Sequence, residues 1–162
     1  MKIIAGHFYF VADSFFEKVQ DPYLKINYEY TYRPHYFPFI DEKTGLLWLV
    51  PCSSKVEKFE RIIAKKKEKH KPVDAIKIVT IFDNKTVLLF QDMFPIAEKY
   101  ISNVYIKGGH AVRISDPDIV AMLEKTAGKI VRMIRKGVKF TPTQPDILKI
   151  EQIMLDELKN EP

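Results

Sequence analysis

Two pairs of short hydrophobic segments in the first half of the chain constrain its fold more than any other feature. Residues 36–40 and 46–50 form the first pair, separated by a polar segment that ends at Gly45, as is typical of a turn. Residues 75–82 and 86–90 form the second pair, separated by a short Asp-Asn-Lys turn. Each pair predicts an antiparallel β-hairpin.

Helical patterns lie mainly after these segments. Apolar residues recur at helical spacing from Asp116 and again from Pro145 onward. An earlier helix is expected to begin at Ser54, where Glu57 completes a capping box, and Pro51 is expected to end the strand before it. Strands that come first and helices that follow predict an α+β fold with a largely antiparallel sheet.

The length and composition indicate a single globular unit. The chain has 162 residues, of which 46% are hydrophobic and 29% are charged. We expect one domain over residues 1–162, because domains commonly contain about 100–150 residues. We also expect a cytoplasmic protein, because neither a secretory signal nor an apolar run approaching the roughly 20 residues of a membrane span is apparent.

Charge and the scarcity of metal ligands narrow the range of partners. The formal net charge is +5, which favours a polyanionic partner. The single cysteine, Cys52, precludes an internal disulfide, and the four histidines are scattered without a metal-binding spacing. We therefore expect neither a metal ion nor a cofactor.

The segment Val50–Lys55 carries two adjacent hydroxyls and an ammonium group where a predicted strand passes into a predicted helix. The first turn of a helix has unpaired N–H groups and a partial positive charge, so phosphate binds there readily. Ser53, Ser54 and Lys55 would add hydrogen-bond donors to such a site. Alternatively, the two serines only cap the helix and Lys55 is solvated, since capping boxes are common.

His35 begins the strand that is expected to pair with residues 46–50. In an antiparallel pair the start of one strand lies beside the end of the next, so His35 and Arg33 are predicted to lie near Ser53. An imidazole suits acid–base catalysis, and hydroxyls and cations suit stabilisation of charge on a scissile phosphate. This set predicts RNA cleavage without a metal ion. Alternatively, His35 is a structural histidine on a strand.

Aromatic and basic side chains are the candidate RNA contacts. Tyr28, Tyr30 and Tyr32 alternate, so an extended chain would present them on one face, or they belong to a half-buried strand or an aromatic loop. Tyr36 is a further candidate for base stacking. The basic candidates are Lys65, Lys66, Lys67, Lys69, Lys107, Arg113, Lys129, Arg132, Arg135 and Lys136. Alternatively, the lysine run is a solvated helix end and the last four are the polar side of a core helix.

At these residues the chain resembles the toxins of type III toxin–antitoxin systems, the ToxN/AbiQ-like endoribonucleases, and most closely the CptN branch. The resemblance spans nearly the whole chain. It is carried by residues 33–40 (RPHYFPFI), 48–58 (WLVPCSSKVEK) and 91–96 (QDMFPI), in this order and spacing.

The resemblance implies a compact, highly twisted antiparallel sheet, similar to the MazF/Kid-like barrel, surrounded by helices. It implies metal-independent cleavage of RNA that leaves 2′,3′-cyclic phosphate and 5′-hydroxyl ends. It also implies an RNA antitoxin made of short pseudoknot repeats, which the toxin processes and which occupies its active-site groove in a closed protein–RNA assembly. Released toxin would cut cellular or phage RNA, arrest growth and in some cases abort phage infection.

The resemblance further implies roles for individual residues. The hydroxyl pair of the family falls on Ser53 and Ser54, which would stabilise the transition state and bind phosphate. The family's lysine lies just beyond that pair. In this chain Lys55 comes one position early and Lys58 comes about one helical turn later, so either of them would serve.

The remaining catalytic positions lie upstream. The basic residue that follows the upstream proline in many relatives falls on His35, where a histidine would make cleavage more sensitive to pH. The family's tyrosine falls on Tyr30 or Tyr32.

Two other functions agree with the same composition. A non-catalytic RNA- or DNA-binding module would explain the basic charge and the tyrosines equally well, and would leave RNA intact. A protein-targeting toxin of the gyrase-poisoning type would arrest growth with cellular RNA unchanged, but it would leave the Ser-Ser-Lys cluster without a role.

Overall fold

A computed structural model describes residues 1–161 of the chain. The strands are β1 (Phe8–Val11), β2 (Pro34–Ile40), β3 (Leu47–Ser53), β4 (Ile76–Ile81), β5 (Asn84–Leu89), β6 (Phe94–Ile96), β7 (Ile101–Val104), β8 (Ile106–Lys107) and β9 (His110–Ala111). The helices are α1 (Asp13–Val19), α2 (Val56–Glu68), α3 (Pro117–Arg135) and α4 (Ile147–Lys159), with short 3₁₀ turns at Phe90–Asp92 and Glu98–Tyr100. The predicted α+β class is confirmed.

The main sheet has the order β4-β5-β3-β2-β1-β7, and β6 pairs with β3 outside this path. All of its strand pairs are antiparallel, and both predicted hairpins are present as β2–β3 and β4–β5. The turn of the second hairpin consists of Phe82 and Asp83, not of residues 83–85 as predicted, because Asn84 and Lys85 pair with β4. The expected closed barrel is not found, because no pairing joins β4 to β7 within the part of the chain that the structure describes. The sheet therefore keeps two open edges.

Strand β3 links two regions of the molecule. Its first residues, Leu47–Leu49, pair with β6, and its last residues, Cys52 and Ser53, pair with β5. Pro51 lies between these two stretches, where neither β6 nor β5 pairs with β3. No hydrogen bond from a backbone N–H is needed on that side of the strand, so a proline fits there. The prediction that Pro51 ends the strand is therefore wrong, since β3 continues as far as Ser53.

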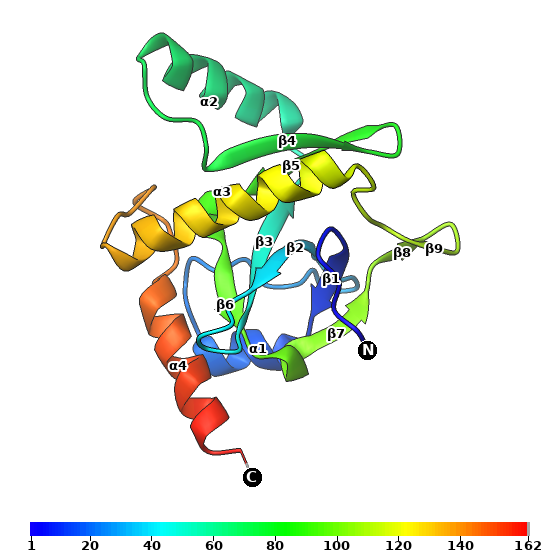
Figure 1. The fold of residues 1–162 in the computed structure, drawn as a ribbon, viewed down its shortest axis with the longest axis vertical. Helices are drawn as coiled ribbons and strands as arrows, with labels where there is room; N and C mark the ends of the chain where they lie inside the picture. Colours follow the sequence, from blue (N-terminus) through cyan, green and yellow to red (C-terminus); the bar gives the residue numbers. More distant parts are fainter. Residues whose placement is uncertain (162) are drawn as a thin grey trace.

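The main body is built around one large core. Its largest fully buried side chains include Trp48, Tyr9, Tyr36 and Phe15. Helix α3 crosses in front of β3 and β2, and α4 runs down beside β6 (Figure 1). Asp116 caps α3, because its carboxylate accepts a hydrogen bond from the backbone N–H of Asp118 at 2.9 Å.

A second, smaller core holds α2 against the β4–β5 hairpin. It consists of Phe59, Ile76, Val87 and Leu89, with partly buried aliphatic residues around them. We call α2, β4 and β5 the outer layer; it stands at one end of the molecule (Figure 1). In residues 1–161, no helix has both the length and the apolar character required to cross a membrane.

Candidate active site

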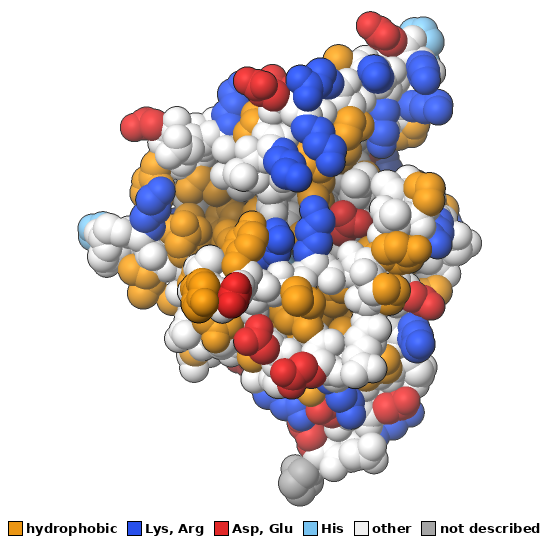
Figure 2. Space-filling view, turned by 180° about the vertical axis from the view of Figure 1, so that it is seen from behind, with side chains coloured by type: hydrophobic (Ala, Val, Ile, Leu, Met, Phe, Trp, Pro, Cys, Tyr) orange, Lys and Arg blue, Asp and Glu red, His pale blue; other side chains and the backbone are white. Residues whose placement is uncertain are grey.

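The end of β3 opens into a cavity of about 200 Å³ between the main body and the outer layer. Figure 2 shows a hollow with a hydrophobic floor on this side of the molecule, with Lys and Arg side chains gathered beside it and toward α2. The cavity is lined by Phe8, Tyr28, Pro34, Cys52, Ser53, Ser54, Ile81, Phe82, Asn84, Lys85, Thr86, Tyr105, Lys107 and Val112. Hydroxyl, phenol and ammonium groups from distant parts of the sequence thus share one site.

The two serine hydroxyls are free to donate hydrogen bonds into this cavity. Ser53 Oγ accepts a hydrogen bond from the backbone N–H of Lys55 at 3.2 Å, which leaves its own proton available. Ser54 is exposed, and its hydroxyl has no hydrogen-bond partner in the described part of the chain. Helix α2 begins at Val56 with Lys55 in the N-cap position and no side-chain cap. The predicted capping box of Ser54 and Glu57 is therefore wrong, because Ser54 precedes the cap.

Tyr28 lines the cavity, although the sequence interpretation named it only as one of three alternating tyrosines and did not select it as a catalytic residue. Its hydroxyl accepts a hydrogen bond from Arg33 Nη1 at 3.0 Å, and the Arg33 guanidinium carbon lies 4.0 Å from the centre of the Tyr28 ring. Arg33 is itself anchored, because its Nε donates to the Ile26 carbonyl at 2.7 Å and its backbone N–H donates to Asn27. The alternation of tyrosines was the available signal, but it did not distinguish Tyr28 from its neighbours.

Two lysines from different hairpins bring positive charge to the cavity. Lys85 lies on β5 and has one exposed ion pair, with Glu60 at 3.8 Å. Lys107 lies on β8, and no acidic group within residues 1–161 pairs with it. The predicted Lys55 and Lys58 do not line the cavity, and Lys58 Nζ lies 5.3 Å from the centre of the Phe59 ring.

His35 lies on the other side of the sheet from the serines. Only 2% of its surface is exposed, and it lines a separate small cavity together with Asp92 and Phe94. Side chains alternate along β2, so Pro34 lines the serine cavity while His35 points to the opposite face. The predicted convergence of His35 with Ser53 is therefore wrong.

The surroundings of His35 also hold its imidazole neutral. Burial lowers its pKa to about 4, although the carbonyl oxygen of Arg33, 3.0 Å from Nδ1, favours the protonated form. A buried imidazole that stays neutral and lies away from the cavity does not have access to a phosphodiester there.

The predicted tyrosines lie in different environments. Tyr30 is 92% exposed, and the ring of Tyr32 lies 5.6 Å from that of Phe10, so neither lines the cavity. Tyr36 is completely buried and cannot stack on a base, which corrects its predicted role in RNA binding. Tyr105, which was not predicted, does line the cavity.

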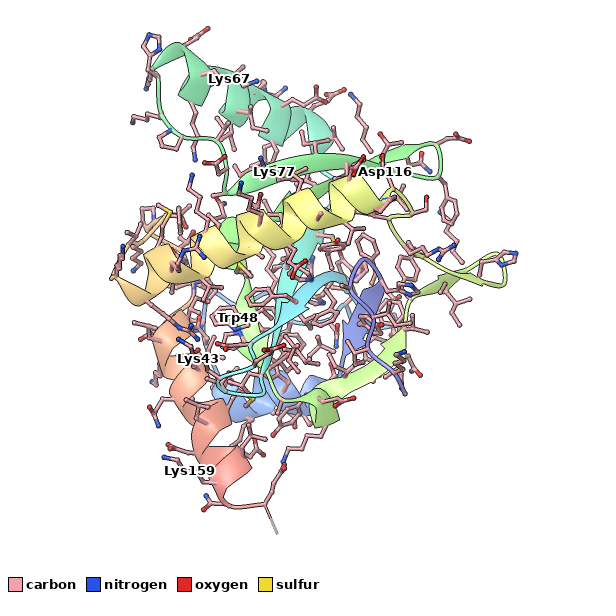
Figure 3. The ribbon with its side chains drawn as sticks, viewed as in Figure 1. Lys43, Trp48, Lys67, Lys77, Asp116 and Lys159 are labelled. Carbon is pink, nitrogen blue, oxygen red and sulfur yellow. The ribbon has the colours of Figure 1, made fainter. Side chains whose placement is uncertain are left out.

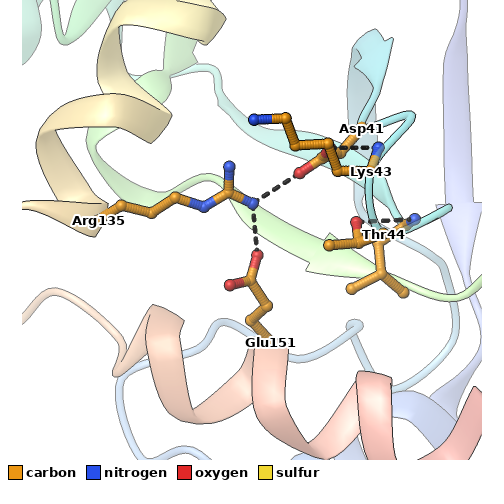
Figure 4. Close-up of polar contacts among 6 residues, drawn as sticks. Asp41, Lys43, Thr44, Arg135 and Glu151 are labelled. Carbon is orange, nitrogen blue, oxygen red and sulfur yellow. Dashed lines mark hydrogen bonds and ion pairs between the residues drawn. The ribbon is translucent and has the colours of Figure 1, made fainter. Parts of the chain in front are cut away.

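Arg135 is partly exposed, and its guanidinium is engaged by two carboxylates of the protein. Its Nη2 donates to Asp41 at 2.6 Å and to Glu151 at 2.9 Å (Figure 4). Burial of Asp41 opposes its ionisation, but the bond to Arg135 and the backbone N–H of Lys43 outweigh this and lower its pKa. Arg135 thus joins α3 to α4 and to the β2–β3 turn, and its contact with RNA remains a prediction.

The other basic candidates differ in how free they are. Lys129 pairs with Asp74 at 2.7 Å, so its charge is largely neutralised locally. Figure 3 shows Lys67 on α2 at the opposite end of the molecule from Lys159. Lys65, Lys67, Lys69, Arg113, Arg132 and Lys136 are exposed and Lys66 is half-buried. Their contacts with RNA remain predictions.

The cavity suits an anion better than a metal ion. No Asp or Glu is among the residues that line it. More generally, residues 1–161 contain no group of three or more His, Cys, Asp or Glu side chains arranged to hold a metal ion. Cations and hydroxyl donors are the groups that bind phosphate directly.

Two solved structures share this fold. AbiQ, a lactococcal anti-phage endoribonuclease belonging to the type-III toxin–antitoxin system, superimposes with a TM-score of 0.73 at 14% identity, over 97% of this chain and 100% of AbiQ. A structure from a bacterial antiviral system regulated by a processed non-coding RNA gives 0.65 at 13% identity, over 90% of this chain and 95% of that chain. No protein-family model and no curated protein matches the sequence.

These likenesses establish the fold. The predicted resemblance to ToxN/AbiQ-like toxins is confirmed at this level, whereas the CptN branch remains a prediction. The cavity at the end of β3 is accordingly a candidate active site on a fold shared with an endoribonuclease.

Proposed function

We propose that this chain is an endoribonuclease, the toxin of a type III toxin–antitoxin system. The observation that carries the proposal is the cavity at the end of β3, where Ser53 and Ser54 meet Tyr28, Lys85 and Lys107. The fold shared with AbiQ supports the same reaction class. We infer that RNA is the ligand, because the cavity combines aromatic rings with phosphate-binding groups.

Cleavage proceeds by attack of the 2′-hydroxyl on the adjacent phosphorus, which breaks the bond to the 5′-oxygen. The proton of the attacking 2′-hydroxyl passes to solvent water, because the cavity is open and no side chain that lines it is assigned as a base. The products are a 2′,3′-cyclic phosphate and a 5′-hydroxyl end. Ser53 and Ser54 donate hydrogen bonds to the non-bridging oxygens, and the ammonium groups of Lys85 and Lys107 stabilise the negative charge that develops on them. Donors fixed in this way typically contribute about 3–4 kcal/mol each to stabilisation of a transition state.

Tyr28 is the proposed acid for the leaving oxygen. Because its hydroxyl oxygen accepts a hydrogen bond from Arg33, its own proton is free to point into the cavity. The positive charge of Arg33 also stabilises the phenolate that remains after the proton is transferred. The chain needs no metal ion in this scheme, since lysines supply the charge that a metal would otherwise supply.

We propose that an RNA antitoxin holds the enzyme silent. Short pseudoknot repeats, processed by the toxin itself, would occupy the cavity and the basic surface beside it in a closed protein–RNA assembly. The second similar structure belongs to an antiviral system that a processed non-coding RNA regulates, which supports this partner. Release of the toxin in the cytoplasm would expose cellular or phage RNA to cleavage, arrest growth and abort phage infection. Within this scheme we assign the chain to the CptN branch.

The test is cleavage of a single-stranded RNA by protein purified free of RNA, in the presence of EDTA. We expect wild type to cut, and the double variant Ser53→Ala, Ser54→Ala to lose at least about 100-fold in rate. The matched control is Ser14→Ala, which removes an exposed serine hydroxyl on α1. Full activity of the double variant would refute the proposed site, and intact RNA with wild type would indicate a binding module instead.

A further inference from the structure

A second hollow lies against the tip of the β4–β5 hairpin, next to the candidate active site. It has a volume of about 700 Å³ and is lined by His7, Phe82, His110, Arg113 and Asp116, among others. Ile81 and Phe82 line both hollows, so the two adjoin at the hairpin tip. The tip is therefore the place where a ligand strand bound in the serine cavity would meet this groove.

Phe82 occupies that tip in a conformation that an aromatic residue rarely adopts. It is the first residue of a two-residue turn between Ile81 and Asn84, and its φ is +55°, a region that favours glycine. The side chain is also 59% exposed, although phenylalanine is usually buried. A phenylalanine at this position therefore stabilises neither the turn nor the core. Backbone strain from a positive φ in a residue other than glycine is found most often at functional sites.

The charge of the groove matches a phosphate backbone. Arg113 is exposed, and no acidic group in the described chain pairs with it. Lys107 and His110 lie on the adjacent β8–β9 hairpin. The carboxylate of Asp116 is occupied by the backbone N–H of Asp118 at the start of α3. Cations beside an exposed aromatic ring are the combination that binds unpaired nucleotides.

We propose that this groove is a nucleotide subsite that binds the RNA strand next to the cleavage position. An unpaired base stacks on the exposed ring of Phe82, and Arg113 binds a neighbouring phosphate. This inference rests on the proposed function, because it takes RNA to be the ligand of the serine cavity. It assigns the subsite to an unpaired strand, since a base inside a duplex does not present its face to an aromatic ring.

The first test measures binding without cleavage. The probe is a fluorescein-labelled, single-stranded 2′-O-methyl oligonucleotide of about 12 nucleotides, followed by anisotropy. Phe82→Gly should weaken binding by about ten-fold, and Phe82→Trp should retain it. The matched control is Gln20→Gly at the end of α1, where φ is +47°. It relieves the same backbone strain and should bind like wild type, and both glycine variants should melt close to wild type.

The second test separates stacking from charge. Each phosphate that is neutralised on a single strand contributes about 0.7 to the slope of log affinity against log salt concentration. Arg113→Gln should reduce that slope by about this amount, whereas Phe82→Gly should leave it unchanged. Lys159→Gln is the control, because Figure 3 shows Lys159 and Asp116 at opposite ends of the molecule.

The outcomes distinguish the subsite from the catalytic proposal. If wild type binds the oligonucleotide and Phe82→Gly binds it equally well, the subsite is refuted while cleavage by wild type stands. If wild type binds without cutting and Phe82→Gly binds weakly, the subsite stands and the endoribonuclease assignment fails. If wild type does not bind the oligonucleotide at all, the subsite is refuted together with the assignment of RNA as ligand.

Discussion

The outer layer and the main body differ in how much apolar core holds each of them together. Four buried residues pack α2 against the β4–β5 hairpin, among them Phe59 and Val87. The main body encloses a far larger cluster that includes Trp48, Phe15 and Phe94. Regions with few buried apolar contacts open locally at lower free energy than regions with many. Within the outer layer, α2 is therefore the element where local unfolding is expected first, because β4 and β5 also contribute Val79, Ile81 and Leu88 to the main core.

The two regions also differ in what their charges do. In the main body, Arg135 and Lys99 are each held by two carboxylates at 2.9 Å or less. In the outer layer, the ion pair of Lys85 with Glu60 spans 3.8 Å and is exposed, so it contributes little to stability. The comparison shows that the total charge of this chain is a poor guide to the RNA-binding surface proposed for it. Part of that charge ties helices together, and the remainder is free to bind phosphate.

The largest effect is expected from Phe59→Ala. Loss of a buried phenylalanine typically costs about 3–5 kcal/mol, which the small core of the outer layer does not compensate for. We expect α2 to lose protection in hydrogen exchange while β1 and β2 keep theirs. RNA cleavage should fall by at least about ten-fold, because β5 supplies one wall of the cavity and part of its charge.

Phe15→Ala is the matched substitution in the main core. It removes a side chain of the same size, but one that packs against Phe94 and Tyr100, so its effect should appear as a lower melting temperature of the whole protein. Uniform loss of protection in Phe59→Ala would show that the outer layer does not open independently, and would remove the basis of the comparison.

A smaller effect concerns pH and the main body. Burial keeps the pKa of His35 at about 4 in the folded protein, against about 6.5 in the unfolded chain. Between these values the unfolded state binds the extra proton, so His35 makes the fold less stable as pH falls from 6.5 to 4. The free energy of unfolding then changes by up to about 1.4 kcal/mol per pH unit. His35→Gln should remove this slope in denaturant titrations at pH 7 and pH 5.

Asp92 contributes to the same pH window with the opposite sign. Burial raises its pKa to about 6, although Lys25 opposes the shift, so the folded state binds a proton there before the unfolded state does. Asp92→Asn in parallel separates the two contributions. The rate of RNA cleavage by His35→Gln should follow the wild-type pH profile. If the cleavage rate of this variant no longer rose or fell with pH where the wild-type rate does, His35 would instead be assigned to catalysis.

Local signals made much of the fold predictable. The two hairpins depend on paired apolar segments and the start of α3 depends on an Asp-Pro pair, so each is caused by a short stretch of sequence. The exact turn of the second hairpin was not predictable in this way, because it contains Phe82. Pro51 was misjudged because the need for an N–H donor is decided by β5 and β6, which come from much later in the chain. The beginning of α2 was misjudged by two residues, which changed the role assigned to Ser54.

The candidate site was predictable only in part, for a related reason. The serines were selected because they follow the predicted strand directly, and in the structure Ser53 is the last residue of β3. His35 was expected on the wrong face because pairing gives the neighbours of a strand residue, but not the side to which it points. Tyr28, Lys85 and Tyr105 reach the cavity from three separate segments, and no spacing in the sequence brings them together.

The smallest effect expected is that of Ser54→Ala on stability, and it tests whether Ser54 belongs to the site or to the helix. An N-cap side chain typically contributes about 1 kcal/mol, and Asp116→Ala should lose about that much, since Asp116 caps α3. Ser54 precedes the cap of α2 and is exposed, so Ser54→Ala should change the free energy of unfolding by less than about 0.5 kcal/mol. Equilibrium urea denaturation of the two variants measures the difference directly. If Ser54→Ala destabilised the protein as much as Asp116→Ala, the hydroxyl would be occupied by the backbone of α2. It would then lack the free proton that its proposed contact with the scissile phosphate requires.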